Sequence, residues 1–299
     1  MIIYFIVFMS ALLLSVGLTY IVRKFALAKG IVDAPTAQNL HEKAVPNIGG
    51  LAICLAFLVT VVLITKAVQL PLIIAASIIV VVGLLDDFQG ITPLGKLFGQ
   101  VIAAIILIGS GIKIGCFPDA IGIPLTLFWL VGMTNAINLL DGMDGLAAGV
   151  SAIAALFFMI LALGAGDVNS ALLAVALAGA CIGFLRFNFH KASIFMGDTG
   201  SLFLGFMLAA LAVIYSQHNA GCINLFVPLI ILGVPVADTA FAIMRRLWQR
   251  RSIFNSDTDH FYEWLWKNRK MEYRSIVVLV YIICIIMGLA GLALAWVLT

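Results

Sequence analysis

Four oxygen-bearing side chains repeat every three residues in the stretch NAINLLDGMDGL, residues 135–146. The four residues are Asn135, Asn138, Asp141 and Asp144. On a helix this spacing places them along one drifting stripe, and Gly142 and Gly145 predict that the helix loosens there, so that main chain can approach a ligand closely. Amide and carboxylate oxygens suit Mg²⁺, which completes its shell with water and phosphate oxygens. The stretch therefore predicts a cation-dependent site.

Two further acidic stretches have a similar character. GLLDDFQG, residues 83–90, contains the adjacent carboxylates of Asp86 and Asp87, which repel each other unless a metal or a basic partner compensates. FMGDTGS, residues 195–201, contains Asp198 between glycines. With Lys43 and Lys96 in nearby predicted loops, these acids suit a site for Mg²⁺ and a diphosphate.

The composition sets the environment in which these groups lie. The 299 residues are 64% hydrophobic and 10% charged, and the mean hydropathy is +1.18. Soluble domains carry about 25% charged residues, so the chain is predicted to be an all-α polytopic membrane protein with one domain, residues 1–299. The lipid bilayer is an expected partner and nucleic acid is not.

Hydropathy, turn signals and charges predict ten membrane spans, although several are shorter than the roughly 20 residues that a span usually needs. They are 2–22, 48–65, 71–86, 96–111, 120–137, 146–164, 170–187, 200–216, 222–244 and 276–298.

The loops between these spans differ in charge. One set carries 15 of the 17 Lys and Arg residues, so the positive-inside rule predicts that this set faces the cytoplasm and that both termini face outward. Five acids fall at the same predicted cytoplasmic side: Asp86, Asp87, Asp141, Asp144 and Asp198. Asp167 falls on the other side, where a helix cap is its simplest role.

The five cysteines show no C-x-x-C or other metal-binding spacing. Cys54, Cys181 and Cys284 fall within apolar segments and are interpreted as packing residues. Cys116 and Cys222 flank spans on the predicted outward side. Whether these two form a disulfide is left open by the sequence, because pairing depends on their separation in space.

The acidic stretches belong to a longer series of motifs. In order they are DAPTAQNLHEKAVPNIGG (33–50), GLLDDF with KLFGQ (83–100), NAINLLDGMDGL (135–146), NFHKASIFMGDTGSLFLG (188–205) and PVADTAFAIMRR (235–246). With these motifs the chain resembles the bacterial polyprenyl-phosphate N-acetylhexosamine-1-phosphate transferases, which are related to phospho-MurNAc-pentapeptide translocase.

The resemblance implies a reaction and its partners. A polyprenyl (undecaprenyl) phosphate would attack a UDP-N-acetylhexosamine, with UDP-GlcNAc the favoured donor, to give a prenyl-diphospho-sugar and UMP. Mg²⁺, with Mn²⁺ as an alternative, would be the cofactor. The implied place is the bacterial cytoplasmic membrane, with the site facing the cytoplasm, in the synthesis of a cell-envelope glycan such as lipopolysaccharide or teichoic acid. A homodimer is left open.

The resemblance also implies roles for single residues. Asp86 or Asp87 would orient or deprotonate the prenyl phosphate as a catalytic residue, and Asn138 and Asp198 would bind the metal. The residues expected to bind substrate are His41, Lys43, Lys96, Asn135, Asp141, Asp144, Arg246 and His260.

The chain departs from the family pattern in its last predicted cytoplasmic loop. SDTDHFYEWLWKN, residues 256–268, contains His260 alone where relatives carry a histidine cluster, with Phe261, Tyr262 and Glu263 at the following positions. This departure supports an alternative hypothesis, that the chain is a weak or inactive relative that binds lipid phosphate or regulates a partner. A transporter is a third hypothesis, disfavoured because its acids would lie near the bilayer midplane.

Overall fold

The structure is a computed structural model that describes residues 1–33, 44–65, 69–218, 221–249 and 261–298. These residues form helices and no β-strand, apart from an isolated bridge between Asp33 and Val45. In order the helices are α1 (Ile2–Lys29), α2 (Gly50–Thr60) with its π-helical extension η1 (Val61–Thr65), α3 (Leu70–Gln89), α4 (Pro93–Gly109), α5 (Asp119–Leu140), α6 (Leu146–Gly164), α7 (Val168–Asn188), α8 (Gly197–His218), η2 (Cys222–Leu225), α9 (Phe226–Ile231), α10 (Gly233–Trp248), α11 (Phe261–Arg269) and α12 (Tyr273–Leu298). The prediction of an all-α polytopic membrane protein is confirmed.

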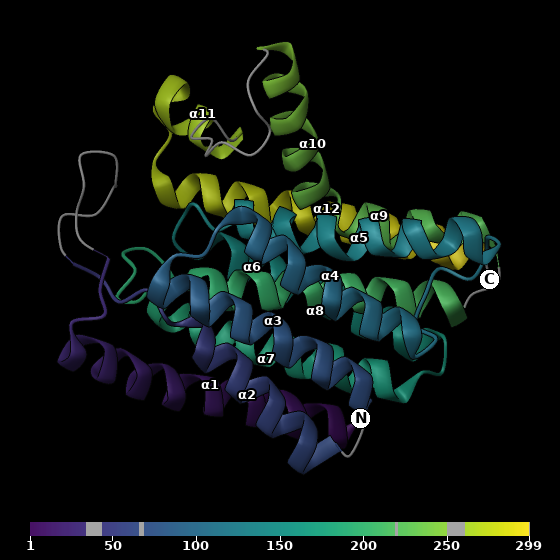
Figure 1. The fold of residues 1–299 in the computed structure, drawn as a ribbon, viewed down its shortest axis with the longest axis horizontal. Helices are drawn as coiled ribbons and strands as arrows, with labels where there is room; N and C mark the ends of the chain where they lie inside the picture. Colours follow the sequence, from purple (N-terminus) through teal and green to yellow (C-terminus); the bar gives the residue numbers. More distant parts are fainter. Residues whose placement is uncertain (34–43, 66–68, 219–220, 250–260, 299) are drawn as a thin grey trace.

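Helix α8 lies at the centre of the bundle. In its most apolar stretch of membrane length 94% of the residues are buried, against 22% for α1 at the periphery. Helices α3, α5 and α6 pack against α8, and α7 lies between α1 and α6 (Figure 1). Helices α3 and α5, which carry Asp86 and Asn138, are therefore packed against the same buried helix.

Small residues bring the inner helices close together, as is common where lipid gives no hydrophobic drive to association. Buried alanines are frequent in α6 and α7. Between α1 and α7 the hydroxyl of Ser15 donates a hydrogen bond of 2.7 Å to the carbonyl of Ala180.

The predicted spans coincide with helices, with one correction. Seven helices of the described chain are long and apolar enough to cross a membrane, and the two shorter apolar helices Gly50–Thr65 and Pro93–Gly109 match two more predicted spans. The predicted span 222–244 is not one straight helix, because the chain bends by 86° between Cys222–Ile231 and Gly233–Trp248. Gly233 and Pro235 favour this break, since proline fits the first turn of a new helix but removes a main-chain hydrogen bond in a helix interior, where it favours a kink or a break.

The bend turns α10 away from the bundle, as Figure 1 shows. Both chain termini lie toward the same end of the bundle in that view. The number of spans and the side of the membrane that the termini face stay predictions.

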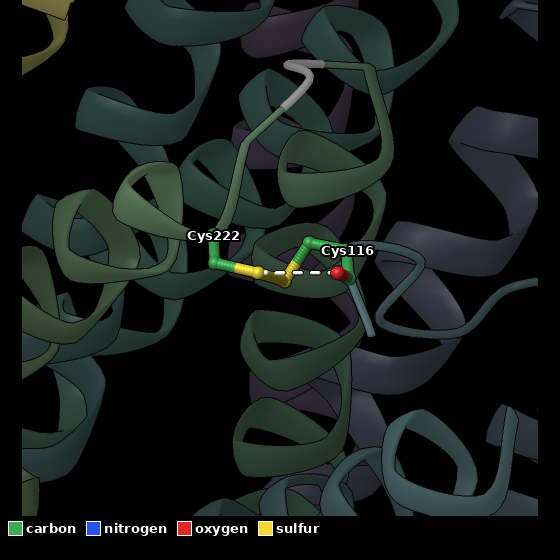
Figure 2. Close-up of a disulfide and its surroundings, with 2 residues drawn as sticks. All are labelled: Cys116 and Cys222. Atoms are coloured by element: carbon green, nitrogen blue, oxygen red, sulfur yellow. Dashed lines mark hydrogen bonds between the residues drawn. A yellow bond between two sulfur atoms is a disulfide. The ribbon is translucent and has the colours of Figure 1, made fainter. Parts of the chain in front are cut away.

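Cys116 and Cys222 are paired in a disulfide, with Cα atoms 5.2 Å apart and a sequence separation of 106 (Figure 2). The bond joins the α4–α5 connection to the start of η2, just before the bent pair α9 and α10. The question that the sequence left open is thereby answered for this pair. Cys54, Cys181 and Cys284 are free and buried, as expected for packing residues.

Candidate functional site

Lys96 joins two of the predicted site acids. Its ammonium group lies 2.5 Å from Asp86 Oδ2 and also forms an ion pair with Asp198. The three side chains come from the end of α3, the first turn of α4 and the first turn of α8. The short α3–α4 turn holds Asp86 beside Lys96, because Asp86 Oδ1 accepts a hydrogen bond of 2.9 Å from the Ile91 amide.

Asp87 has a different set of partners from its neighbour. Its carboxylate accepts hydrogen bonds from the amides of Asp198 (2.7 Å) and Thr199 (3.0 Å), and from the Thr199 hydroxyl (2.5 Å). These donors are at the start of α8, where the first amides of a helix lack partners within it. Asp87 therefore caps α8 across the bundle and holds Asp198 in place. The repulsion expected between Asp86 and Asp87 is relieved by a lysine for one and by a helix N-terminus for the other.

Asn138, in the last turn of α5, meets Asp198 directly. Its Nδ2 donates hydrogen bonds to Asp198 Oδ1 (3.1 Å) and to the hydroxyl of Ser201 (2.9 Å). The structure thus brings together the two residues predicted to bind the metal, and places Lys96 and Asp86 beside them.

Asp144 is fixed by the segment that precedes α8. Its carboxylate accepts a hydrogen bond of 2.9 Å from the Ala192 amide and lies 3.9 Å from His190 Nδ1. Its own amide donates to the hydroxyl of Tyr273. His190 stacks on the Tyr273 ring, with centroids 5.0 Å apart.

Asp141 follows the last turn of α5, as its C-cap. Burial raises the pKa of Asp141 well above the usual range of an aspartate, and the negative charges of Asp198 and Asp87 raise it further. The acidic groups therefore repel one another despite Lys96, so a site that must also accept a phosphate needs additional positive charge.

Asn135, which the sequence predicts to bind substrate, makes a structural contact between two helices. Its amide exchanges two hydrogen bonds with the amide of the buried Gln100, of 2.7 and 3.2 Å, and also donates to the carbonyl of Val131. These bonds use both amide protons of Asn135 to join α4 to α5. Its role in binding substrate stays a prediction.

The remaining predicted residues are spread over the chain. Arg246 is buried near the end of α10, which leaves the bundle. His41, Lys43 and His260 lie outside the described residues. Their roles stay predictions.

Comparison with known proteins identifies the family. A family model described as glycosyl transferase family 4 matches residues 69–216, which include the Asp86, Lys96, Asn138 and Asp198 cluster. A probable undecaprenyl-phosphate N-acetylglucosaminyl 1-phosphate transferase of Bacillus subtilis (strain 168) is 36% identical, and the alignment covers 97% of this chain and 84% of the relative. The chain belongs to the polyprenyl-phosphate sugar-1-phosphate transferase family.

Other members of this transferase family match with similar coverage. The decaprenyl-phosphate N-acetylglucosaminephosphotransferase of Mycobacterium tuberculosis (strain CDC 1551 / Oshkosh) is 34% identical over 92% of this chain and 78% of its own length. The phospho-N-acetylmuramoyl-pentapeptide-transferase of Shouchella clausii (strain KSM-K16) is 34% identical over 94% of each chain. The family predicted from the motifs is thus confirmed.

A magnesium ion is compatible with the donors of this candidate site. Among the residues that the structure describes, no three His, Cys, Asp or Glu side chains are grouped to hold a metal ion by themselves. Mg²⁺ does not require such a group, because it is commonly bound by one or two carboxylates together with water and substrate phosphates. The carboxylate of Asp198 and the neighbouring amide of Asn138 supply oxygens of the appropriate type.

Several residues of the site were missed by reasoning from the sequence. Ser201 and Gln100 hold Asn138 and Asn135, and His190 lies beside Asp144. Each is a polar side chain at a predicted span end or in a motif, so polarity at that boundary was an available signal. Tyr273 gave no comparable signal, because a tyrosine at a span end is typical of a membrane interface.

Proposed function

We propose that this transferase moves N-acetylglucosamine-1-phosphate from a UDP-sugar to a polyprenyl phosphate such as undecaprenyl phosphate, and releases UMP at the cytoplasmic face of a bacterial membrane. The observation that carries the proposal is the cluster in which Lys96 joins Asp86 to Asp198 beside Asn138, at one end of an apolar bundle. The names of the relatives from Bacillus subtilis and Mycobacterium tuberculosis support the same acceptor and group.

The proposed reaction is a direct phosphoryl transfer. An oxygen of the prenyl phosphate attacks the phosphorus next to the sugar, a new P–O bond forms, and the P–O bond to UMP breaks with its electron pair. A phosphate monoester has a second pKa near 6, so it is largely dianionic at neutral pH. The acceptor therefore needs positioning more than deprotonation, and no aspartyl-phosphate intermediate is required.

The chain's own residues divide this work. Lys96 is placed to bind phosphate charge, and Asp86 orients the lysine. Asp87 holds the start of α8, so its contribution is to fix Asp198 rather than to take a proton. Asp141 and Asp144 are proposed to contact the donor. When bound by Asp198 and Asn138, Mg²⁺ or Mn²⁺ supplies positive charge that neutralises the diphosphate.

The test is UMP release by the purified full-length protein with Mg²⁺, undecaprenyl phosphate and a panel of UDP-sugars that includes UDP-GlcNAc. Lys96→Met should remove the activity, and its matched control is Lys113→Met. Lys113 also forms an ion pair, with Asp119 at 2.6 Å, but at the far end of α4. Folded wild-type protein that releases no UMP from any donor would contradict the proposal and favour a non-catalytic relative that binds lipid phosphate.

A further inference from the structure

Three tyrosines from the C-terminal helices bind the main chain between Leu139, in the last turn of α5, and Gly145, at the end of the α5–α6 loop. The hydroxyl of Tyr262 in α11 donates to the carbonyl of Leu139 at 3.1 Å, and the hydroxyl of Tyr281 in α12 donates to the carbonyl of Gly145 at 2.5 Å. The hydroxyl of Tyr273, at the start of α12, accepts from the amide of Asp144. We call these three residues the tyrosine clamp.

Glycines leave the space for two of these rings. A Cβ atom at Gly142 would meet the hydroxyl of Tyr262, and a Cβ atom at Gly149 would meet the hydroxyl and ring of Tyr281. The sequence suggested that glycines in this stretch allow main chain to approach a ligand. At Gly142 the group that approaches is a tyrosine of the same chain.

The clamp belongs to a hydrophobic cluster of its own. Leu140, Met143, Leu146 and Val150 pack with Tyr262, Leu265, Ile276, Val277, Val280 and Cys284 in a group separate from the main core. The main core contains Val82, Ala103 and Leu202, from the helices that carry Asp86, Lys96 and Asp198. The candidate site therefore has two halves. The helices that carry Asp86, Lys96 and Asp198 pack in the main core, whereas the α5–α6 loop packs in the second cluster.

Hydrogen bonds connect these halves at the site, and one of them runs from the Gly145 amide to Asn188 Oδ1 at 2.9 Å. Asn138 reaches Asp198 from the end of α5, and Asp144 accepts from the Ala192 amide. Asp141 and Asp144 lie on the loop beyond Asn138, where the helix has ended. Their position relative to Asp198 consequently depends on what holds the loop main chain.

We propose that Tyr262, Tyr273 and Tyr281 are positioning residues that hold the α5–α6 loop so that Asp141 and Asp144 face the substrates. The inference rests on the proposed function, because it assigns the clamp to the same site. The hydroxyls act through the loop main chain and touch no reacting atom. The last predicted cytoplasmic loop, which contributes α11, is thereby connected to the acids by Tyr262.

Tyrosine-to-phenylalanine variants test the clamp, because they keep the ring and remove the hydroxyl. Tyr262→Phe and Tyr273→Phe should each lower kcat for UMP release about fivefold, which is the factor expected for one hydrogen bond. KM for undecaprenyl phosphate should not change. Tyr20→Phe is the matched control, since Tyr20 is exposed on α1 and its ring contacts Lys24.

A double-mutant cycle separates positioning from general stability. If Tyr273 acts through Asp144, Tyr273→Phe should cost about fivefold in the wild-type background and nothing further in an Asp144→Asn background. An equal loss in both backgrounds, or no loss in the wild type, would overturn the inference.

Hydrogen exchange measured by mass spectrometry gives a readout that needs no turnover. In detergent-purified full-length protein, Tyr273→Phe should speed exchange of the peptide covering residues 139–146 about fivefold, while the peptide covering 197–205 is unchanged. Tyr20→Phe should alter neither peptide. Unchanged exchange at 139–146 overturns the clamp whatever the activity, whereas absent UMP release by wild-type protein contradicts the proposed function.

Discussion

Two aspartates in the first turns of their helices form ion pairs with lysines, but their surroundings differ. Asp198 in α8 pairs with Lys96, which it shares with Asp86, and also accepts from Asn138. Asp119 in α5 pairs with Lys113 six residues away, at 2.6 Å, and its side chain is 66% exposed. From Lys96 helix α4 runs on to Gly109, roughly 20 Å along its axis, and Lys113 lies beyond that far end.

The same kind of ion pair therefore has a different role at each of the two aspartates. The pair at Asp119 is local and solvated, and such pairs contribute little to stability. The group at Asp198 joins α3, α4, α5 and α8, and its acids outnumber its lysine. An excess of acids where four helices meet fits a site completed by a cation or a substrate, and a sequence count of charges cannot distinguish the two pairs.

Among the tests of this comparison, removal of divalent cations should have the largest effect on turnover. With EDTA, UMP release should fall to background, because the acids around Asp198 would then repel the diphosphate. Activity should return with Mg²⁺ or Mn²⁺, whereas Zn²⁺ should substitute poorly. Full turnover in excess chelator, measured with undecaprenyl phosphate and UDP-GlcNAc, would show that Lys96 alone suffices and that Asp198 and Asn138 bind no metal.

Matched substitutions at the two aspartates should give the next largest difference. Asp198→Asn should lower turnover on the order of a hundredfold or more, as loss of a positioned charge commonly does. Asp119→Asn should leave turnover close to that of the wild type. Both proteins should insert and purify normally. Wild-type turnover in a folded Asp198→Asn protein would remove this residue from the site, and a failure to fold would instead favour a structural role at the start of α8.

The loop acids can be compared with Asp167 in the same way. Asp141→Asn and Asp144→Asn should each cut turnover on the order of a hundredfold, with little change in thermal stability. Asp167 caps α7 by accepting from the Ser170 amide at 3.1 Å, as the sequence predicted, and asparagine caps helices equally well. Asp167→Asn should therefore be nearly silent in UMP release and in thermal unfolding. Similar behaviour of all three variants would make the loop acids structural.

The grouping of the acids could be predicted, because it follows from local properties of the sequence. Hydropathy sets the span ends, and Asp86, Asn138 and Asp198 each fall at the same end of the bundle in alternate connections. The partners of Asp87 could not be predicted, since they lie 111 and 112 residues away and depend on how α3 packs against α8. A carboxylate that caps a distant helix has the same sequence signature as one that binds a substrate.

The C-terminal part of the site was also beyond sequence reasoning. Tyr262 was noted only because it stands where relatives carry histidines, and its contact with Leu139 spans 123 residues. The bend after Ile231 did have local signals in Gly233 and Pro235, but a hydropathy average over residues 222–244 conceals them. Hydrogen bonds from distant side chains to the main chain leave no periodic pattern in the sequence, so only the folded structure reveals them.

The smallest effect on turnover is expected at the disulfide end of the molecule. Replacing Cys116 and Cys222 by serine should leave UMP release unchanged, because the bond lies at the end of α4 away from Lys96. Stability should fall by about 2–4 kcal/mol, the usual contribution of a disulfide that closes a long loop. Thermal unfolding of oxidised wild type and the double variant in detergent measures this difference.

The same disulfide also tests the predicted orientation. Disulfides persist on the oxidising side of a membrane, so an impermeant maleimide should label Cys116 and Cys222 in intact cells only after treatment with an impermeant reductant. The double serine variant is the control for labelling elsewhere, because Cys54, Cys181 and Cys284 are buried. Labelling that requires permeabilised cells would place this end in the cytoplasm. The Asp198 cluster would then face outward, away from a cytoplasmic nucleotide sugar, and the proposed sidedness of the reaction would be wrong.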